Sequence, residues 1–245
     1  MPVSENPPPD RQHLELEAVL STERFARYVA WAGGDRGRAA ELYALNTALS
    51  EALYTPLQML EVTLRNRFHT ALGEDHGPLW FDAPGLLVVP HQLEQLAKAK
   101  ELLAAQGKAA EPGRVVAALT FGFWTALLNK EYEELWRATL HRAPDPAARD
   151  DRGKALVRNS FTRPLTPLRE LRNRVAHHEP IVPWNLRKHH AAIVQVTGWL
   201  SPAAAAWTRG RSRFLDVHPP ERIALVREEK ERRAPAPPPG ARPVD

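Results

Sequence analysis

The chain has 245 residues, of which 43% are hydrophobic and 25% are charged, and its formal net charge is +4. These values are typical of a globular protein with one domain, or one large domain with additions, and they permit nucleic-acid binding without requiring it. Cysteine is absent, which excludes disulfides, thiolate nucleophiles and thiolate metal ligands. Because no apolar run approaches the roughly 18 residues of a membrane span, and the N-terminus lacks the pattern of a secretory signal, we expect a soluble, cytoplasmic protein without membrane partners.

Helical signals begin after a proline-rich segment. Residues 1–13 are predicted to form a disordered tail, because prolines lack N–H donors and favour extended, solvated chain. Ser21 is predicted to cap a helix with the sequence TERFARYVAWA, which Gly33 and Gly34 end. Residues 36–72 carry apolar side chains at steps of three and four, the spacing of one buried helical stripe. Pro56 is expected to kink or split this helix.

Amphipathic spacing, caps and prolines predict further helices, with loops at 73–90 and after Pro144. These helices are expected over residues 91–106, 112–127, 130–140, 154–161, 164–178, 185–200, 202–209 and 220–233. The break before Pro164 is expected because the residue that precedes a proline disfavours helical geometry. No alternating run is long enough for a strand, so the sequence predicts an all-α protein. Its helical domain is expected at 14–218, followed at 219–245 by a helix end and a proline-rich tail.

The segment LRNRVAHHEP, residues 171–180, places Arg172, Asn173 and two His at the end of a predicted helix. Asn173 and His177 are four residues apart and share a helix face, whereas Arg172 and His177 are about 140° apart on an ideal helix. One regular helix therefore cannot aim Arg172 and His177 at the same small target. Either the last turn unwinds before Pro180, or two copies of the chain share their groups across a two-fold axis.

These residue types suit phosphate chemistry without a metal. The Arg guanidinium is a charged, planar fork that matches phosphate oxygens, and His exchanges protons near neutral pH. No acidic cluster for magnesium stands nearby, since Glu170 and Glu179 are single carboxylates. Metal-free cleavage of a phosphodiester is easiest when the substrate carries its own nucleophile, as RNA does in its 2′-hydroxyl. The segment indicates an RNA-cleaving site, although Arg and His at a helix end also commonly just neutralise terminal carbonyls.

The segment LRELRNRVAHHEPIV resembles the C-terminal signature of the Abi-like (abortive infection, AbiD/AbiF-type) family of the HEPN superfamily. Upstream, LQMLEVTLRNRFHTAL is similar to an early helix of that family and LTFGFWTALLNKEYEELW to its middle segment, so the resemblance covers roughly residues 20–200. The resemblance implies a HEPN-like helical bundle with additional helices that forms a two-fold homodimer. It also implies a metal-independent endoribonuclease with an Arg-x4–6-His motif at the dimer interface.

Carried over residue by residue, the resemblance makes Arg172 the motif Arg, Asn173 the polar residue after it and His177 the motif His. His178 also satisfies the looser spacing, so the resemblance does not decide which His carries the proton. Neighbouring basic residues are expected to bind RNA, and no metal or cofactor is expected. These basic residues are Arg169, Arg174, Arg187 and Lys188.

The expected partners follow from the same resemblance. Abi-like proteins are associated with bacterial defence against phage, and some HEPN proteins are toxins restrained by an antitoxin. The implied partners are therefore an RNA substrate, a second copy of the chain and a protein or RNA antitoxin. Two other functions stay open: a non-catalytic RNA-binding or regulatory module, and an interaction protein whose motif only builds a dimer interface. A nuclease needs His177 or His178, whereas a binding module needs mainly its Arg and Lys residues.

Three further features have structural interpretations that compete with functional ones. The fragment Arg65-Asn66-Arg67-Phe68-His69 looks similar to the motif but has the wrong spacing, and it is expected to serve packing, with Glu61 pairing with Arg65 one turn away. The His pairs at 177–178 and 189–190 do not match the zinc-protease pattern, because Val182 occupies its last position. Trp184 is expected to anchor a loop, with flanking of the site as the alternative.

Overall fold

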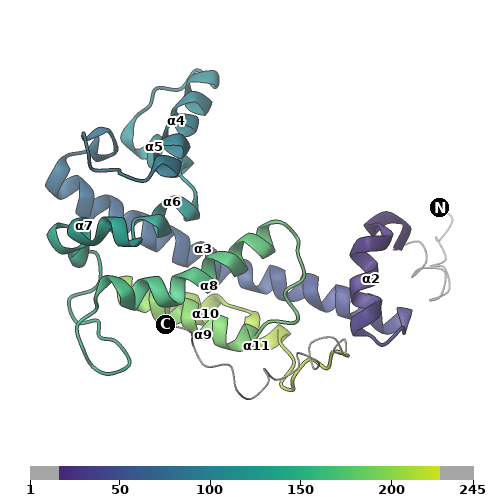
Figure 1. Ribbon diagram of the computed structural model, residues 1–245. Coiled ribbons are helices and arrows are strands. Elements are labelled where there is room, and N and C mark those ends of the chain that lie inside the picture. Colours follow the sequence, from purple (N-terminus) through teal and green to yellow (C-terminus); the bar gives the residue numbers. More distant parts are fainter. Residues whose placement is uncertain (1–16, 227–245) are drawn as a thin grey trace, which may run out of the picture. The chain divides into compact units, whose positions relative to one another are not determined.

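A computed structural model of the protein describes residues 17–226, and all of their regular structure is helical (Figure 1). Arg149 and Ala155 form an isolated antiparallel β-bridge, which belongs to no strand. The predicted all-α class is therefore confirmed. None of the helices between residues 17 and 226 is both long and apolar enough to cross a membrane.

The described residues divide into two compact units, one formed by residues 17–48 with 219–226 and one formed by residues 49–218. The predicted tail at 1–13 lies outside the described residues, as does the part of the predicted C-terminal segment beyond residue 226. The described residues 219–226 group with the N-terminal unit.

In the smaller unit, α2 (Thr22–Trp31) begins where predicted, since the Ser21 side chain accepts a hydrogen bond from the backbone N–H of Arg24. The ring of Tyr28 packs edge-on against Trp31, and its burial raises the pKa of the phenol to about 12. The helix predicted over 220–233 is wrong for its described part, because residues 220–226 are not helical. This stretch bonds elsewhere instead: the Val226 N–H donates to the Trp31 carbonyl at 2.8 Å.

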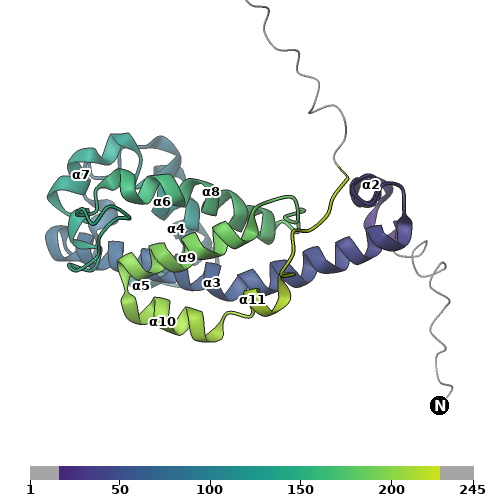
Figure 2. The same ribbon diagram turned by 90° about the horizontal axis from the view of Figure 1, so that it is seen from below.

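The helix α3 (Arg36–His76) starts in the smaller unit and continues into the larger one. In chain order, the larger unit then contains η1 (Trp80–Asp82), α4 (Pro90–Ala105), α5 (Pro112–Ala118), α6 (Phe121–Ala126), η2 (Lys130–Tyr132), α7 (Glu133–Ala138), η3 (Leu140–Arg142), α8 (Arg158–Ala176), α9 (Leu186–Leu200), α10 (Pro202–Arg211) and α11 (Phe214–Val217). Within this unit, α9 packs between α8 and α10, and α6 packs against α8 (Figures 1 and 2). These contacts fix the position of α8, which carries the candidate motif.

Pro56 is predicted to kink or split α3, and the split is wrong, because the helix is continuous through this residue. The predicted apolar stripe is buried on both sides of the proline within the larger unit. It consists of Leu49, Leu53, Leu57, Leu60, Leu64, Phe68 and Leu72. Burying each such side chain contributes about 1.5–3 kcal/mol, which together outweighs the roughly 3 kcal/mol that an interior proline costs.

The helix predicted from Pro112 to Leu127 is two helices, α5 and α6. Leu119 is extended, with ψ of 138°, and the Thr120 hydroxyl accepts from the backbone N–H of Phe123 at 3.3 Å. Thr120 is thus an N-cap inside an apolar run, where the helical spacing continues across the break. The capping residue Thr120 is the feature of the sequence from which the start of α6 could have been predicted.

Helix α8 is one helix of 19 residues, so the two pieces predicted around Arg163 and Pro164 are wrong. Both Pro164 and Pro167 lie inside it, and residues 154–157 are not helical. Four side chains on one face of α8 are buried, and this burial offsets the backbone bonds that the prolines remove. They are Phe161, Leu165, Leu168 and Leu171.

We expect the substitution Pro164→Ala to stabilise the protein. Alanine restores a backbone donor in the interior of α8, and the gain in free energy of unfolding is about 1–2 kcal/mol after allowance for the more flexible unfolded chain. Urea denaturation followed by circular dichroism measures this difference. The matched control is Arg163→Ala at the neighbouring exposed position, for which the change is within about 0.5 kcal/mol. A destabilised Pro164→Ala variant would show that the proline ring makes packing contacts that alanine cannot replace.

Candidate functional site

The motif segment forms the C-terminus of α8 and the turn that closes it. The last helical residue is Ala176, His177 follows as the C-cap, and His178 has a left-handed backbone with φ of 56°. The N–H of His178 donates to the Val175 carbonyl at 3.2 Å, and the N–H of Glu179 donates to the Arg174 carbonyl at 2.8 Å. This pair of bonds is the Schellman arrangement, which normally places glycine at the left-handed position. A histidine there is held by the turn in a conformation that most residues avoid.

Arg172 is joined to helix α3. Its Nε donates to the Glu61 carboxylate at 3.1 Å, and about a third of its side chain is exposed. The pairing of Glu61 with Arg65 expected from the sequence is not formed: the Arg65 Nε donates to the Asn66 side chain instead. Spacing along α3 identifies Glu61 as one half of an ion pair but cannot reveal a partner 111 positions later in the chain.

Asn173 and His177 are exposed on the surface at the end of α8. The His177 N–H donates to the Asn173 carbonyl at 2.9 Å, as expected for residues one turn apart. Within residues 17–226, no hydrogen bond is formed by the side chains of Asn173 and His177, and none joins Arg172 to His177. The two polar groups on the exposed face are therefore available to a ligand, while Arg172 is directed toward α3.

Arg174, one of the predicted RNA-binding residues, holds the turn after α8. Its guanidinium lies over the Trp184 ring, 5.0 Å from the ring centroid, and it is within 3.4 Å of the Glu179 carboxylate. It also donates to the Pro180 carbonyl at 3.4 Å. The ring of Trp184 also contacts the ring of His189, and the two ring centroids are 5.3 Å apart. Trp184 therefore anchors the loop between α8 and α9.

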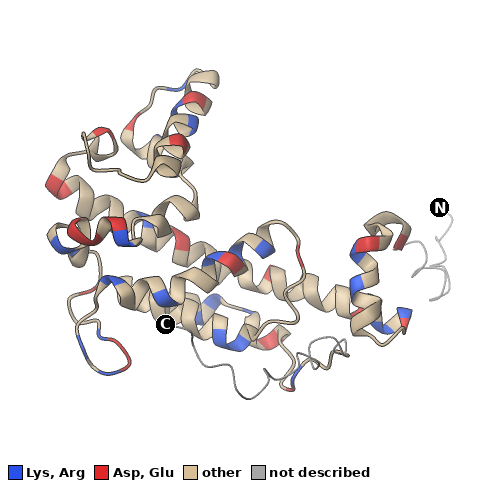
Figure 3. Ribbon diagram, in the orientation of Figure 1, with Lys and Arg blue, Asp and Glu red and all other residues tan. Residues whose placement is uncertain are grey.

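The other predicted RNA-binding residues lie on α8 and α9, the part of the larger unit where several Lys and Arg appear in Figure 3. Lys188 is exposed in the first turn of α9, which the Asn185 side chain caps as predicted. Arg187 is exposed as well, and its Nε donates to His218 at 3.3 Å. Arg169 is half-exposed on α8. These three side chains therefore place exposed or half-exposed positive charge on α8 and α9, the two helices that the motif turn connects.

The second Arg-Asn fragment, on α3, performs a packing role. The Arg67 Nε donates to the Ala143 carbonyl at 2.7 Å, which ties α3 to the chain after η3. The buried indole of Trp80 donates from Nε1 to Nδ1 of His69 at 2.9 Å. Because Nδ1 accepts, the proton of the neutral His69 ring is on Nε2. This His therefore supports a buried tryptophan.

We expect the free energy of unfolding to decrease as the pH falls below about 6.5. Burial lowers the pKa of His69 and of His190, so the unfolded chain binds protons that the folded chain rejects. Their contribution to stability is complete above the unfolded pKa and is lost as the pH falls toward the lower folded pKa. Chemical denaturation at a series of pH values from 7.5 to 5 measures it. The double variant His69→Gln with His190→Gln is expected to flatten this dependence, and an unchanged slope would assign it to other groups.

The second His pair, on α9, makes hydrogen bonds within the fold. Among residues 17–226, no group of three or more His, Asp or Glu is placed to hold a metal ion. In the second His pair, His189 bonds to the Asn185 carbonyl at 2.7 Å and His190 to the Ser212 hydroxyl at 2.9 Å. Each of these rings already has a partner within the fold.

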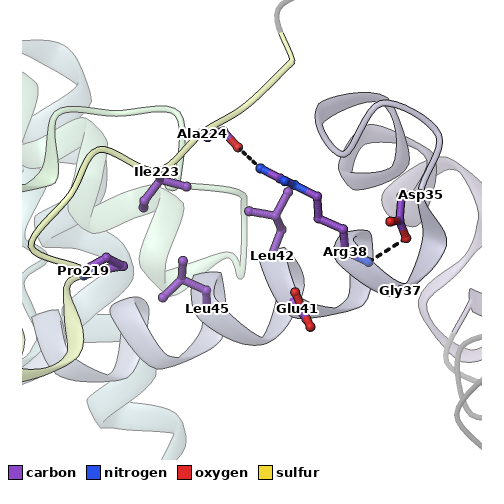
Figure 4. Close-up of a pocket in the computed structure, with 9 residues that line it drawn as sticks. All are labelled: Asp35, Gly37, Arg38, Glu41, Leu42, Leu45, Pro219, Ile223 and Ala224. Atoms are coloured by element: carbon purple, nitrogen blue, oxygen red, sulfur yellow. Dashed lines mark hydrogen bonds between the residues drawn. The ribbon is translucent and has the colours of Figure 1, made fainter.

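The smaller unit contains an open cavity of about 570 Å³ beside the first turns of α3 (Figure 4). Arg38 lies at its edge, where its guanidinium donates to the Ala224 carbonyl at 2.9 Å and its backbone N–H donates to the Asp35 side chain at 3.0 Å. Asp35 and Arg38 are thus engaged in these bonds, and Glu41, the third charged lining residue, is exposed. No histidine is among its lining residues, so the cavity lacks the proton-transfer group present at the end of α8.

Comparisons with protein-family models, with curated proteins and with solved structures find no match for this chain.

Proposed function

We propose that this chain is a metal-independent endoribonuclease of the Abi-like, HEPN type that acts in bacterial defence against phage, as a toxin where an antitoxin accompanies it. The observation that supports this best is the end of α8. There an Arg side chain that donates to Glu61 lies in the same two helical turns as Asn173 and His177, whose side chains are exposed. A side chain that binds phosphate, a polar group and a group that carries protons are the minimum for cleaving RNA through its own 2′-hydroxyl.

In the proposed reaction, a neutral His imidazole removes the proton of the 2′-hydroxyl, and the 2′-oxygen attacks the phosphorus. The bond from phosphorus to the 5′-oxygen breaks, and the leaving oxygen takes a proton from a His imidazolium. The products are a 2′,3′-cyclic phosphate and a 5′-hydroxyl. Arg172 stabilises the negative charge that develops on the non-bridging oxygens, and Asn173 orients the phosphate.

The proposed active form is a two-fold homodimer. Positions 172 and 177 are about 140° apart on an ideal helix, and Arg172 is directed toward α3, so one copy is not expected to aim both groups at one phosphate. A second copy related by a two-fold axis brings its own His177 to the first copy, which makes a composite site.

A cleavage assay with EDTA on mixed cellular RNA tests the proposal. We expect the wild type to cut RNA and to leave cyclic-phosphate and 5′-hydroxyl ends, which enzymatic end-labelling distinguishes from 5′-phosphate ends. Cutting that stops when EDTA is added, or that leaves 5′-phosphates, contradicts the mechanism.

The second candidate function is a non-catalytic RNA-binding module, and one observation favours it. The Glu61 carboxylate lies beside the guanidinium of Arg172 and offsets part of its charge, which weakens a phosphate site. A binding module retains RNA on a filter without producing new ends. Its affinity depends on Arg169, Arg187 and Lys188 and is insensitive to the loss of both motif histidines.

A further inference from the structure

The pair formed by Glu61 and Arg172 joins two helices at the proposed site. Glu61 lies on α3, the helix with the buried apolar stripe, and Arg172 lies in the last turns of α8. Their side chains are only 20% and 34% exposed, so both are held by their surroundings while remaining accessible to a ligand. Such a partly desolvated pair restricts the side chains more than an exposed surface pair does.

The geometry of the pair leaves most of the guanidinium for a ligand. Glu61 accepts from Nε at 3.1 Å, and within residues 17–226 the Nη atoms of Arg172 have no hydrogen-bond partner. A guanidinium has five N–H donors in a fixed plane, so fixing the Nε edge sets the direction in which the Nη edge points. Glu61 can therefore determine where a bound phosphate lies without touching it.

We propose that Glu61 is the positioning residue for Arg172 in RNA cleavage. This inference rests on the proposed nuclease function. Its carboxylate reduces the net attraction of the site for RNA in the ground state and keeps the Nη edge in place for the charge of the transition state. Removing the carboxylate frees Arg172 to rotate while it stays charged, so binding survives and catalysis is lost.

The test compares wild type with Glu61→Gln in steady-state cleavage of a short fluorogenic RNA in EDTA. We expect kcat to fall about 10–100-fold, the range found for a misplaced catalytic group, while KM is unchanged or lower. Glu61→Asp, which keeps the charge on a shorter side chain, restores part of kcat. The matched control is Glu51→Gln, because Glu51 is also an α3 carboxylate paired with an Arg, at 3.4 Å from Arg213, on an open surface. It leaves kcat and KM unchanged.

A second readout follows the pair itself. The Nε–Hε signal of Arg172 in a proton–nitrogen spectrum, assigned by its loss in Arg172→Ala, is expected to shift in Glu61→Gln and not in Glu51→Gln. Wild-type cleavage that Glu61→Gln leaves unchanged overturns the positioning role alone. A fall in kcat that matches an equal loss of folded protein also overturns it. Absence of cleavage by the wild type overturns the nuclease function and the positioning role together.

Discussion

Arg172→Ala is expected to lower kcat/KM for RNA cleavage by a factor of about 100–1,000, the cost of removing one donor that stabilises a developing oxyanion. Alanine removes the charge and the fork of donors, so the phosphorus oxygens lose their stabilising partner in the transition state. The Glu61 carboxylate left behind is only 20% exposed, so we expect a modest loss of stability, and cleavage is compared at equal amounts of folded protein. Single-turnover cleavage of a short RNA in EDTA measures the effect.

The control for lost charge is Arg209→Ala, on the exposed last turn of α10. Both substitutions remove one positive charge, so a general loss of attraction for RNA affects them equally. We expect Arg209→Ala to keep cleavage within about threefold, because it lies outside the motif and contributes at most a screened phosphate contact. Equal losses in the two variants would mean that Arg172 attracts RNA through bulk charge and has no place in the reaction.

The same experiment separates the nuclease from the RNA-binding module. For a binding module, Arg172→Ala weakens RNA binding modestly. It also reduces the slope of log affinity against log salt concentration by about one, the value for one lost phosphate contact. For the nuclease, binding of a substrate analogue that lacks the 2′-hydroxyl is largely kept while cleavage of RNA is lost. The comparison of the two substrates therefore distinguishes a residue that acts on the transition state from one that only holds the ligand.

Much of the fold follows from local signals in the sequence. The caps Ser21 and Asn185 begin α2 and α9 as predicted, and each side chain accepts from a backbone N–H three residues later. The apolar stripe of α3 is buried as its spacing predicts. Caps and spacing act within one or two turns, so a single sequence contains the information needed to place them.

The features that the sequence did not reveal depend on contacts between distant segments. The prolines of α8 predict a break, but burial of Leu165 and Leu168 on the same face keeps the helix continuous. Glu61 is expected to pair along α3, but α8 supplies Arg172 instead. The left-handed backbone of His178 is also unexpected, because glycine is the usual residue at that position. In each case tertiary structure overrides a local preference.

The left-handed conformation of His178 decides how the two motif histidines must be compared. The native histidine already carries a Cβ at φ of 56°, so His178→Ala leaves this backbone strain in place and removes the imidazole alone. Glycine adopts the conformation without strain but also makes the unfolded chain more flexible, so His178→Gly reports on the turn itself. At position 177 the backbone has φ of −96°, so alanine is suitable there.

With these variants, we expect His177→Ala to lower kcat by a factor of about 100–10,000, the range for loss of a general acid or base, while His178→Ala and His178→Gly retain cleavage. The reason is the position of His177 one turn after Asn173, with its ring exposed and no hydrogen-bond partner among the described residues. The reverse result, loss with His178→Ala and retention with His177→Ala, would transfer the proton-carrying role to His178. Sedimentation of the same variants tests the interaction-protein alternative, in which His177→Ala weakens self-association and has no effect on RNA. If His177→Ala self-associates and binds RNA as the wild type does but no longer cuts it, His177 takes part in the chemistry, because neither a binding module nor a dimer interface loses cleavage alone.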